Sequence, residues 1–179
     1  YEEIIRLARI SVGLGISKLR ITGGEPLLRH GVDRLVAGLS QLPGVEDLAM
    51  TTNGFLFARQ AEALRRAGLH RVSFSMDSLD PANFKRMTWR DGHSEEHEGI
   101  RLAREAGFKP VKVNAVVIRG LNDHEIEALA AFARDQDLSL RFPLGGGAAM
   151  ETTLDLAASA LASALQQSRD EARHAGTLP

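Results

Sequence analysis

Short apolar segments alternate with amphipathic helical segments along most of this chain, and this alternation limits the possible folds more than any other feature. Five segments favour strands, at intervals of roughly 25 to 40 residues. They are residues 18–22, 47–52, 71–76, 111–118 and 139–142. Strands that alternate with helices form parallel sheets with right-handed crossovers. The sequence therefore predicts an α/β fold, a partial (β/α) barrel of about five parallel strands with outer helices.

Helical periodicity fills the intervals between the predicted strands. Helices are expected at residues 4–12, 32–42, 55–67, 95–106 and 122–135. Asp80 followed by Pro81 is typical of an N-cap and first helical position, so a further helix begins there. Asn122 and Glu125 have the spacing of a capping box for the last of these helices.

The chain changes character after its fifth predicted strand. Residues 1–142 are interpreted as an incomplete partial-barrel domain, and residues 143–179 as a Gly-rich loop followed by a C-terminal helix from 153 to 175. No sixth strand is expected. Two interpretations of the helix stay open: it covers the exposed edge of the sheet, or it binds a partner.

Composition excludes several classes of function. The 179 residues carry a net charge of −1, which gives no argument for nucleic acid or an anionic membrane as a partner. No apolar run reaches about 18 residues, and no signal-peptide pattern is present, so a cytoplasmic protein is expected. Cysteine is absent, which excludes disulfides, thiolate zinc sites and cysteine-ligated iron–sulfur clusters within these residues. The chain starts inside a helical pattern without an initiator Met, so we interpret it as a fragment of a larger domain; whether the truncation is natural stays open.

Polar residues follow one predicted strand after another, which is typical of the mouth of a (β/α) barrel. Gly23 and Gly24 would let a ligand approach the backbone closely, although a purely structural turn is an equal alternative. Arg20 and Lys112 alternate with apolar neighbours and are expected to point inward, which favours a phosphate or carboxylate ligand unless each pairs with a nearby acid. Thr51 and Ser75 would add hydroxyl groups, or simply cap their strands; these residues are candidates for binding.

Residues 93–97 read His-Ser-Glu-Glu-His and match a zinc-peptidase pattern. On one helix, His93 and His97 would share a face. His93 is expected to precede the helix, however, and no third ligand is evident. A zinc site therefore stays a minor alternative.

Six segments in order resemble one family, the GTP 3′,8-cyclases (molybdenum cofactor biosynthesis protein A) of the radical S-adenosylmethionine class. They are residues 18–27, 48–54, 71–80, 111–117, 120–126 and 140–142. The resemblance covers about residues 1–142. It implies a lyase that uses S-adenosylmethionine and [4Fe–4S] clusters to convert GTP into a cyclic pyranopterin precursor, in the cytoplasm, with a homodimer as an open expectation.

The resemblance also implies roles for seven residues. Gly23, Gly24, Glu25 and Ser75 would bind S-adenosylmethionine, and Arg20, Thr51 and Lys112 would bind GTP. The implied catalytic residues stay unknown, and no metal ligand is expected in the chain. A basic residue from each of two strands suits a triphosphate.

The chain departs from this family in two places. The family's cysteine motifs for both clusters have no counterpart, so the 179 residues alone are expected to be inactive. Gly146 stands where the family has a methionine that helps to hold S-adenosylmethionine. Two alternatives therefore stay open, a different radical enzyme that modifies peptides and a non-catalytic remnant; cysteine motifs in the adjoining reading frame would argue against the remnant.

Overall fold

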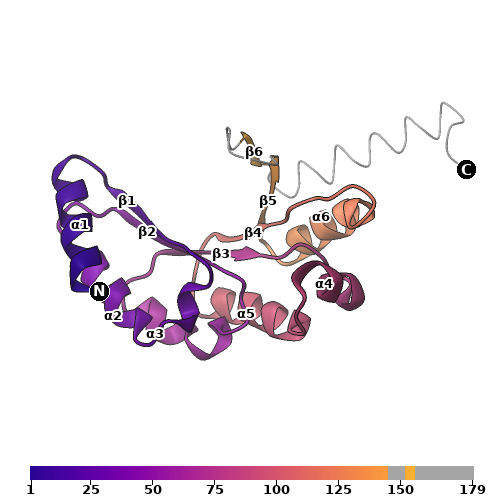
Figure 1. Cartoon of the computed structure of the whole chain (residues 1–179), viewed down its shortest axis with the longest axis horizontal. Coiled ribbons are helices and arrows are strands. Elements are labelled where there is room, and N and C mark those ends of the chain that lie inside the picture. The colour runs from indigo at the N-terminus through magenta and orange to yellow at the C-terminus, as the bar shows by residue number, and fades with distance from the viewer. Residues whose placement is uncertain (145–151, 156–179) are drawn as a thin grey trace, which may run out of the picture. The chain divides into compact units, whose positions relative to one another are not determined.

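The computed structural model describes residues 1–144 and 152–155. These fall into two compact units, which are described separately. Unit 1 comprises residues 1–75 and 92–111, and unit 2 comprises the described residues among 76–91 and 112–179. Strands and helices alternate along the chain, as Figure 1 shows. The predicted α/β class with parallel strands is confirmed.

Unit 1 contains three parallel strands in the order β1, β2, β3. In register, Leu19 pairs with Leu48, and Met50 pairs with Val72. The elements are α1 Glu2–Gly13, β1 Lys18–Ile21, η1 Pro26–Leu28, α2 Val32–Ser40, β2 Asp47–Thr52, η2 Phe57–Arg59, α3 Ala61–Arg66, β3 Arg71–Ser75 and α5 His93–Glu105.

The core of unit 1 lies between the helices and one face of these strands. Alternate side chains of β2 and β3 are fully buried, namely Leu48, Met50, Val72 and Phe74. Edge-on contacts join the rings of Phe57 and Phe74, whose centroids are 5.1 Å apart, and those of Phe57 and Phe108, 5.8 Å apart. The opposite face of the strands carries the polar residues, because successive side chains of a strand point to opposite faces.

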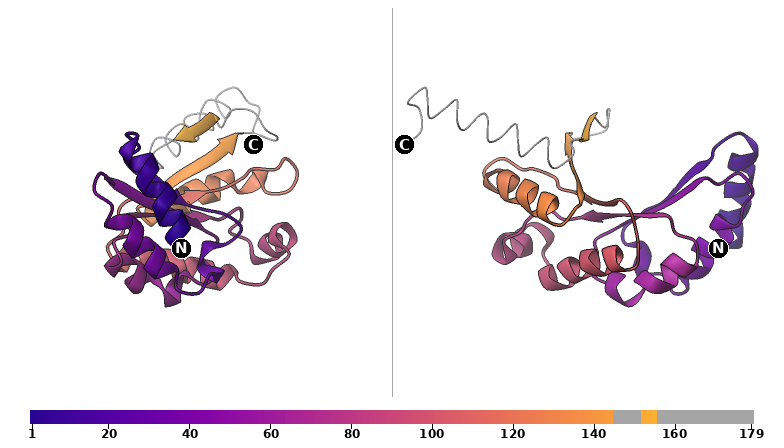
Figure 2. Two further views of the ribbon diagram at one scale, coloured as in Figure 1. Left: turned by 60° about the vertical axis from the view of Figure 1, so that its left-hand side comes forward. Right: turned by 180° about the vertical axis from the view of Figure 1, so that it is seen from behind.

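Unit 2 contains the remaining elements. They are α4 Pro81–Thr88, β4 Val111–Asn114 (whose first residue closes unit 1), η3 Asp123–Glu125, α6 Ile126–Asp135, β5 Ser139–Leu144 and β6 Thr152–Asp155. β4 and β5 run parallel, with Val113 opposite Leu140. β5 and β6 run antiparallel, with Phe142 opposite Leu154, and the left view of Figure 2 shows these two strands side by side.

The C-terminal helix was expected to start at residue 153, and this start is wrong. Residues Thr152–Asp155 form a sixth strand instead, so the expectation of no sixth strand is also wrong. β5 likewise continues to Leu144, two residues beyond its predicted end. Two β-branched threonines favour an extended backbone over a helix, and the edge of β5 offers hydrogen-bonding partners that the periodicity of a single segment does not reveal. The rest of the predicted helix, like Gly146, lies outside the described residues.

Two further boundaries needed correction. Residues 55–67 are not one helix, because Gln60 separates η2 from α3 and its side-chain amide donates to the carbonyl of Leu27 at 3.1 Å. β4 ends at Asn114 rather than at residue 118, because the amide of Val116 bonds to Asp77 (2.7 Å) instead of to a neighbouring strand. In both places a side chain bonds to a residue far away in sequence. Periodicity within a short segment cannot predict such contacts.

The predicted N-cap of α4 is confirmed. The side chain of Asp80 accepts the amide of Asn83 at 2.7 Å, and Pro81 is the first residue of α4. Within residues 1–144 and 152–155, no helix is long and apolar enough to cross a membrane.

Candidate functional site

The loop after β1 leaves its backbone open on one side. Gly23 has a φ of 147°, in the region that favours glycine, and both Gly23 and Gly24 are exposed. A Cβ atom added at either residue would meet no heavy atom within 4 Å. The backbone here is therefore accessible to a ligand.

The carboxylate of Glu25 fastens this loop to the end of β2. Its Oε1 accepts the Thr52 hydroxyl at 2.8 Å and the Leu27 amide at 3.0 Å, and its Oε2 accepts the Asn53 amide at 2.7 Å. Three donors to one half-buried carboxylate fix both the loop and the carboxylate itself. Glu25 therefore fixes the conformation of the loop.

Arg20 lies on the polar face of β1. Its Nη1 donates to the Thr51 hydroxyl at 3.0 Å and lies 3.5 Å from the Ser73 hydroxyl. The structure thus brings the predicted residues Arg20 and Thr51 together, and adds Ser73, which sequence reasoning missed. Ser73 is two residues before the predicted Ser75, so the two-residue period of a strand was the available signal.

Ser75 and Lys112 occupy the predicted strand positions. Ser75 is the last residue of β3 and is exposed. Lys112 lies in β4, half-buried and opposite Ser139 of β5. Lys112 belongs to unit 2, whereas the other six predicted residues belong to unit 1.

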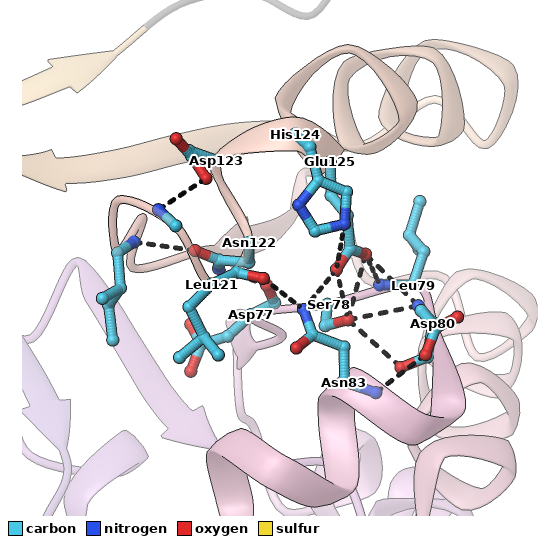
Figure 3. A network of polar contacts seen from close by, with 12 residues as sticks. Asp77, Ser78, Leu79, Asp80, Asn83, Leu121, Asn122, Asp123, His124 and Glu125 are labelled. Atoms are coloured by element: carbon cyan, nitrogen blue, oxygen red, sulfur yellow. Dashed lines mark hydrogen bonds and ion pairs between the residues drawn. The ribbon is translucent and has the colours of Figure 1, made fainter.

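Unit 2 holds a buried polar network centred on Glu125, shown in Figure 3. The carboxylate accepts the Ser78 hydroxyl at 2.8 Å, the Asn83 amide group at 2.6 Å, and the backbone amides of Leu79 at 2.7 Å and Asp80 at 3.2 Å. One acid thus fixes the loop that follows β3 and the first turn of α4. Sequence reasoning did not identify this role.

The capping box expected between Asn122 and Glu125 does not form. The side chain of Asn122 instead accepts the Ile118 amide at 2.7 Å and donates to the carbonyl of Asp77 at 2.7 Å. Asn122 thus bonds both within its own loop and to Asp77, 45 residues away, and Glu125 bonds to the loop after β3. A buried polar group must be hydrogen-bonded, so these contacts take precedence over capping a turn.

The surroundings shift the pKa values of Glu125 and Asp77 in opposite directions. Burial alone would raise the pKa of Glu125, but the hydrogen bonds from Asn83, Ser78, Leu79 and Asp80 outweigh it and lower the pKa below its ordinary value. Burial raises the pKa of Asp77, and the single hydrogen bond from Val116 offsets this only in part. Of these two acids, Glu125 is therefore the one whose ionised form is favoured.

His93 and His97 lie together at the start of α5. α5 begins at His93, so the expectation that His93 precedes the helix is wrong. The two Nε2 atoms are 3.2 Å apart. Among the described residues, no group of three or more His, Cys, Asp or Glu side chains is placed to hold a metal ion.

Parallel strands, outer helices and a glycine loop at a strand end define an α/β protein of the partial-barrel class. The chain belongs to the radical SAM superfamily, whose family model matches residues 1–133.

Curated relatives agree with this assignment. The chain is 50% identical over 142 residues to a GTP 3′,8-cyclase of Petrotoga mobilis, covering 79% of this chain and 44% of that protein. It is 52% identical over 143 residues to a GTP 3′,8-cyclase of Acidothermus cellulolyticus, covering 79% of this chain and 40% of that protein. The chain therefore spans less than half the length of these relatives.

Two solved structures share the fold at low sequence identity. Streptococcus suis SuiB superposes with a TM-score of 0.71 at 18% identity, covering 97% of this chain and 40% of that one. The radical SAM enzyme coproporphyrinogen III oxidase (HemN) of Escherichia coli superposes with a TM-score of 0.60 at 14% identity, covering 98% of this chain and 45% of that one. They support the partial barrel.

Proposed function

We propose that these residues form the S-adenosylmethionine- and GTP-binding part of a GTP 3′,8-cyclase, a lyase of molybdenum cofactor biosynthesis. The observation that carries the proposal is the identity of about half to relatives with that activity, over 142 residues of this chain. The likeness to SuiB is far lower in sequence, so it supports the fold alone.

S-adenosylmethionine would bind at the loop after β1, where it would supply the radical chemistry of the family. Gly23 and Gly24 offer an open backbone, and Glu25 holds that backbone in place. Ser75, exposed at the end of β3, adds a hydroxyl group. The residues present therefore suit a ligand held by backbone and hydroxyl hydrogen bonds.

GTP would bind at the polar face of the strands. Arg20 donates to the neutral hydroxyls of Thr51 and Ser73, which position its guanidinium without cancelling its charge. An arginine in that state can bind phosphate oxygens through two parallel hydrogen bonds. Lys112 of β4, in unit 2, is proposed as a further GTP ligand on the family resemblance.

The iron–sulfur clusters implied by the family do not fit the residues present. The 179 residues contain no cysteine, so they supply no thiolate to a cluster. The proposed contribution of this chain is to bind and orient the two ligands. A cytoplasmic location and a homodimer belong to the proposal as expectations, the latter open to sedimentation analysis.

Calorimetric titration of the chain with GTP tests the nucleotide site. Arg20→Ala and Lys112→Ala should each weaken binding at least about tenfold, because each removes a charge that contacts phosphate. Arg9→Ala and Lys109→Ala are matched controls, since both side chains are exposed and outside the site. GTP affinity that is unchanged in Arg20→Ala and Lys112→Ala would contradict the nucleotide assignment.

A second titration, with S-adenosylmethionine, tests the loop independently. Gly24→Val should abolish binding, because a branched side chain would occupy the space through which the ligand approaches the backbone. GTP affinity should stay within about twofold in the same variant. Retained S-adenosylmethionine binding would overturn the assignment of the loop.

A further inference from the structure

The helix α5 begins with two histidines whose rings converge. His93 and His97 are one turn apart, so they lie on the same side of the helix. The ring centroids are 4.4 Å apart, and the planes are tilted by 51°. The two Nε2 atoms face each other at 3.2 Å, and both side chains are half-buried.

This nitrogen–nitrogen distance suits two ligands of one metal ion. Imidazole nitrogens lie about 2.0–2.1 Å from tetrahedral zinc, which places two of them about 3.3 Å apart. The observed 3.2 Å is close to that separation. Without a metal, one ring must donate a proton to the other, and a metal ion would take the place of that proton.

We propose that His93 and His97 form a chelate for a divalent transition-metal ion such as Zn²⁺, with water in the remaining coordination positions. Imidazole pairs suit Zn²⁺, Cu²⁺ and Ni²⁺ rather than Mg²⁺ or Ca²⁺. Neither histidine is among the residues assigned to S-adenosylmethionine or GTP, so this proposal does not depend on that one.

The metal would strengthen the beginning of α5. Its N-cap residue, Gly92, has no side chain to accept the first amides of the helix. A metal ion bound to residues one turn apart would close that turn, and an ion that binds the native state alone raises the free energy of unfolding.

The zinc-peptidase interpretation of the same motif gains no support. The general base of such a site would be Glu96, but this side chain is 1% exposed. It packs under Gly54, where an added Cβ would lie 3.3 Å from the Glu96 Cγ. The proposed site is therefore a chelate rather than a hydrolytic centre.

Titration of the untagged chain with Co²⁺ and Zn²⁺ tests the proposal. One equivalent should bind, and Co²⁺ should give visible absorption bands. His93→Gln and His97→Gln should each weaken Zn²⁺ affinity at least about tenfold, since losing even an outer partner of a ligand costs that much. His30→Gln is the matched control, because His30 is exposed and outside α5.

A second readout covers the case in which His97→Gln fails to fold. Amide NMR signals of α5 in the unsubstituted chain should broaden first when substoichiometric Ni²⁺ is added. Unchanged Zn²⁺ affinity in His93→Gln, or broadening centred elsewhere, would overturn the proposal. Selective broadening of α5 together with weakened binding in His93→Gln would establish it.

Discussion

Glu25 and Asn53, 28 residues apart in sequence, are joined by a hydrogen bond of 2.7 Å from the Asn53 amide to Glu25 Oε2. The bond ties the glycine loop after β1 to the end of β2. Thr52 donates to the other oxygen of the same carboxylate at 2.8 Å. The loop proposed for S-adenosylmethionine therefore depends on a neighbouring strand for its shape.

Replacing Glu25 by Gln should destabilise the chain by about 1–3 kcal/mol. Glu25 accepts on both oxygens, whereas a glutamine side chain can accept on only one and would direct an N–H group at a donor. Urea denaturation monitored by circular dichroism measures the loss.

Glu46→Gln is the matched control for that experiment. Glu46 is exposed and accepts one hydrogen bond, from Ser17 at 3.0 Å. Its replacement should change the free energy of unfolding by less than about 0.5 kcal/mol. Equal effects of the two substitutions would refute a special role for Glu25.

Ionised Glu125 should stabilise unit 2 at neutral pH. Its pKa is lowered in the folded chain, so the stabilisation is complete above the unfolded pKa of about 4.3 and is lost as the pH falls through the folded value. Glu125→Gln should cost about 2 kcal/mol at pH 7 and much less at pH 3. Denaturant unfolding at the two pH values measures this, and a loss that is the same at both would be inconsistent with the ionised role.

Asp77 should affect the pH dependence of stability in the opposite sense to Glu125. Its pKa is raised by burial, so the neutral acid is favoured in the folded state, and this contribution is lost as the pH rises through the raised pKa. Asp77→Asn keeps an oxygen for the Val116 amide but does not titrate. Stability should therefore fall more steeply on acidification in the variant than in the parent chain; a shallower fall between pH 6 and 3 would show the sign to be wrong.

Local pattern was sufficient to locate β1 to β5 and most helices. Leu19 and Ile21 on either side of Arg20 were the basis for expecting Arg20 to point away from the helices, because the period of a strand equals two residues. In the structure Arg20 donates to the Thr51 hydroxyl at 3.0 Å, so these two candidate residues are neighbours.

Long-range contacts account for what the sequence did not reveal. Glu125 bonds to Ser78, 47 residues away, and spacing along the chain gives no sign of such a partner. Its position three residues after Asn122 suggested a capping box instead. The strand at Thr152–Asp155 likewise depends on β5 as a neighbour, so helical periodicity alone gave the wrong structure.

Gly99 of α5 occupies a position with no room for a side chain. A Cβ atom there would lie 2.9 Å from the carbonyl oxygen of Gly54 and 3.3 Å from the ring of Phe74. The first of these neighbours is backbone, which cannot move aside as a flexible side chain does. The close approach of α5 to the turn after β2 therefore requires glycine.

Gly99→Ala should destabilise the chain by about 1–3 kcal/mol, although alanine favours helices more than glycine does. Gly13→Ala is the matched control, because Gly13 is also helical and an added Cβ would meet no heavy atom within 4 Å. That change should stabilise the chain by about 0.5–1 kcal/mol. Thermal or urea denaturation of the two variants should thus give opposite signs, and stabilisation by both would show that α5 can move away from Gly54 at little cost.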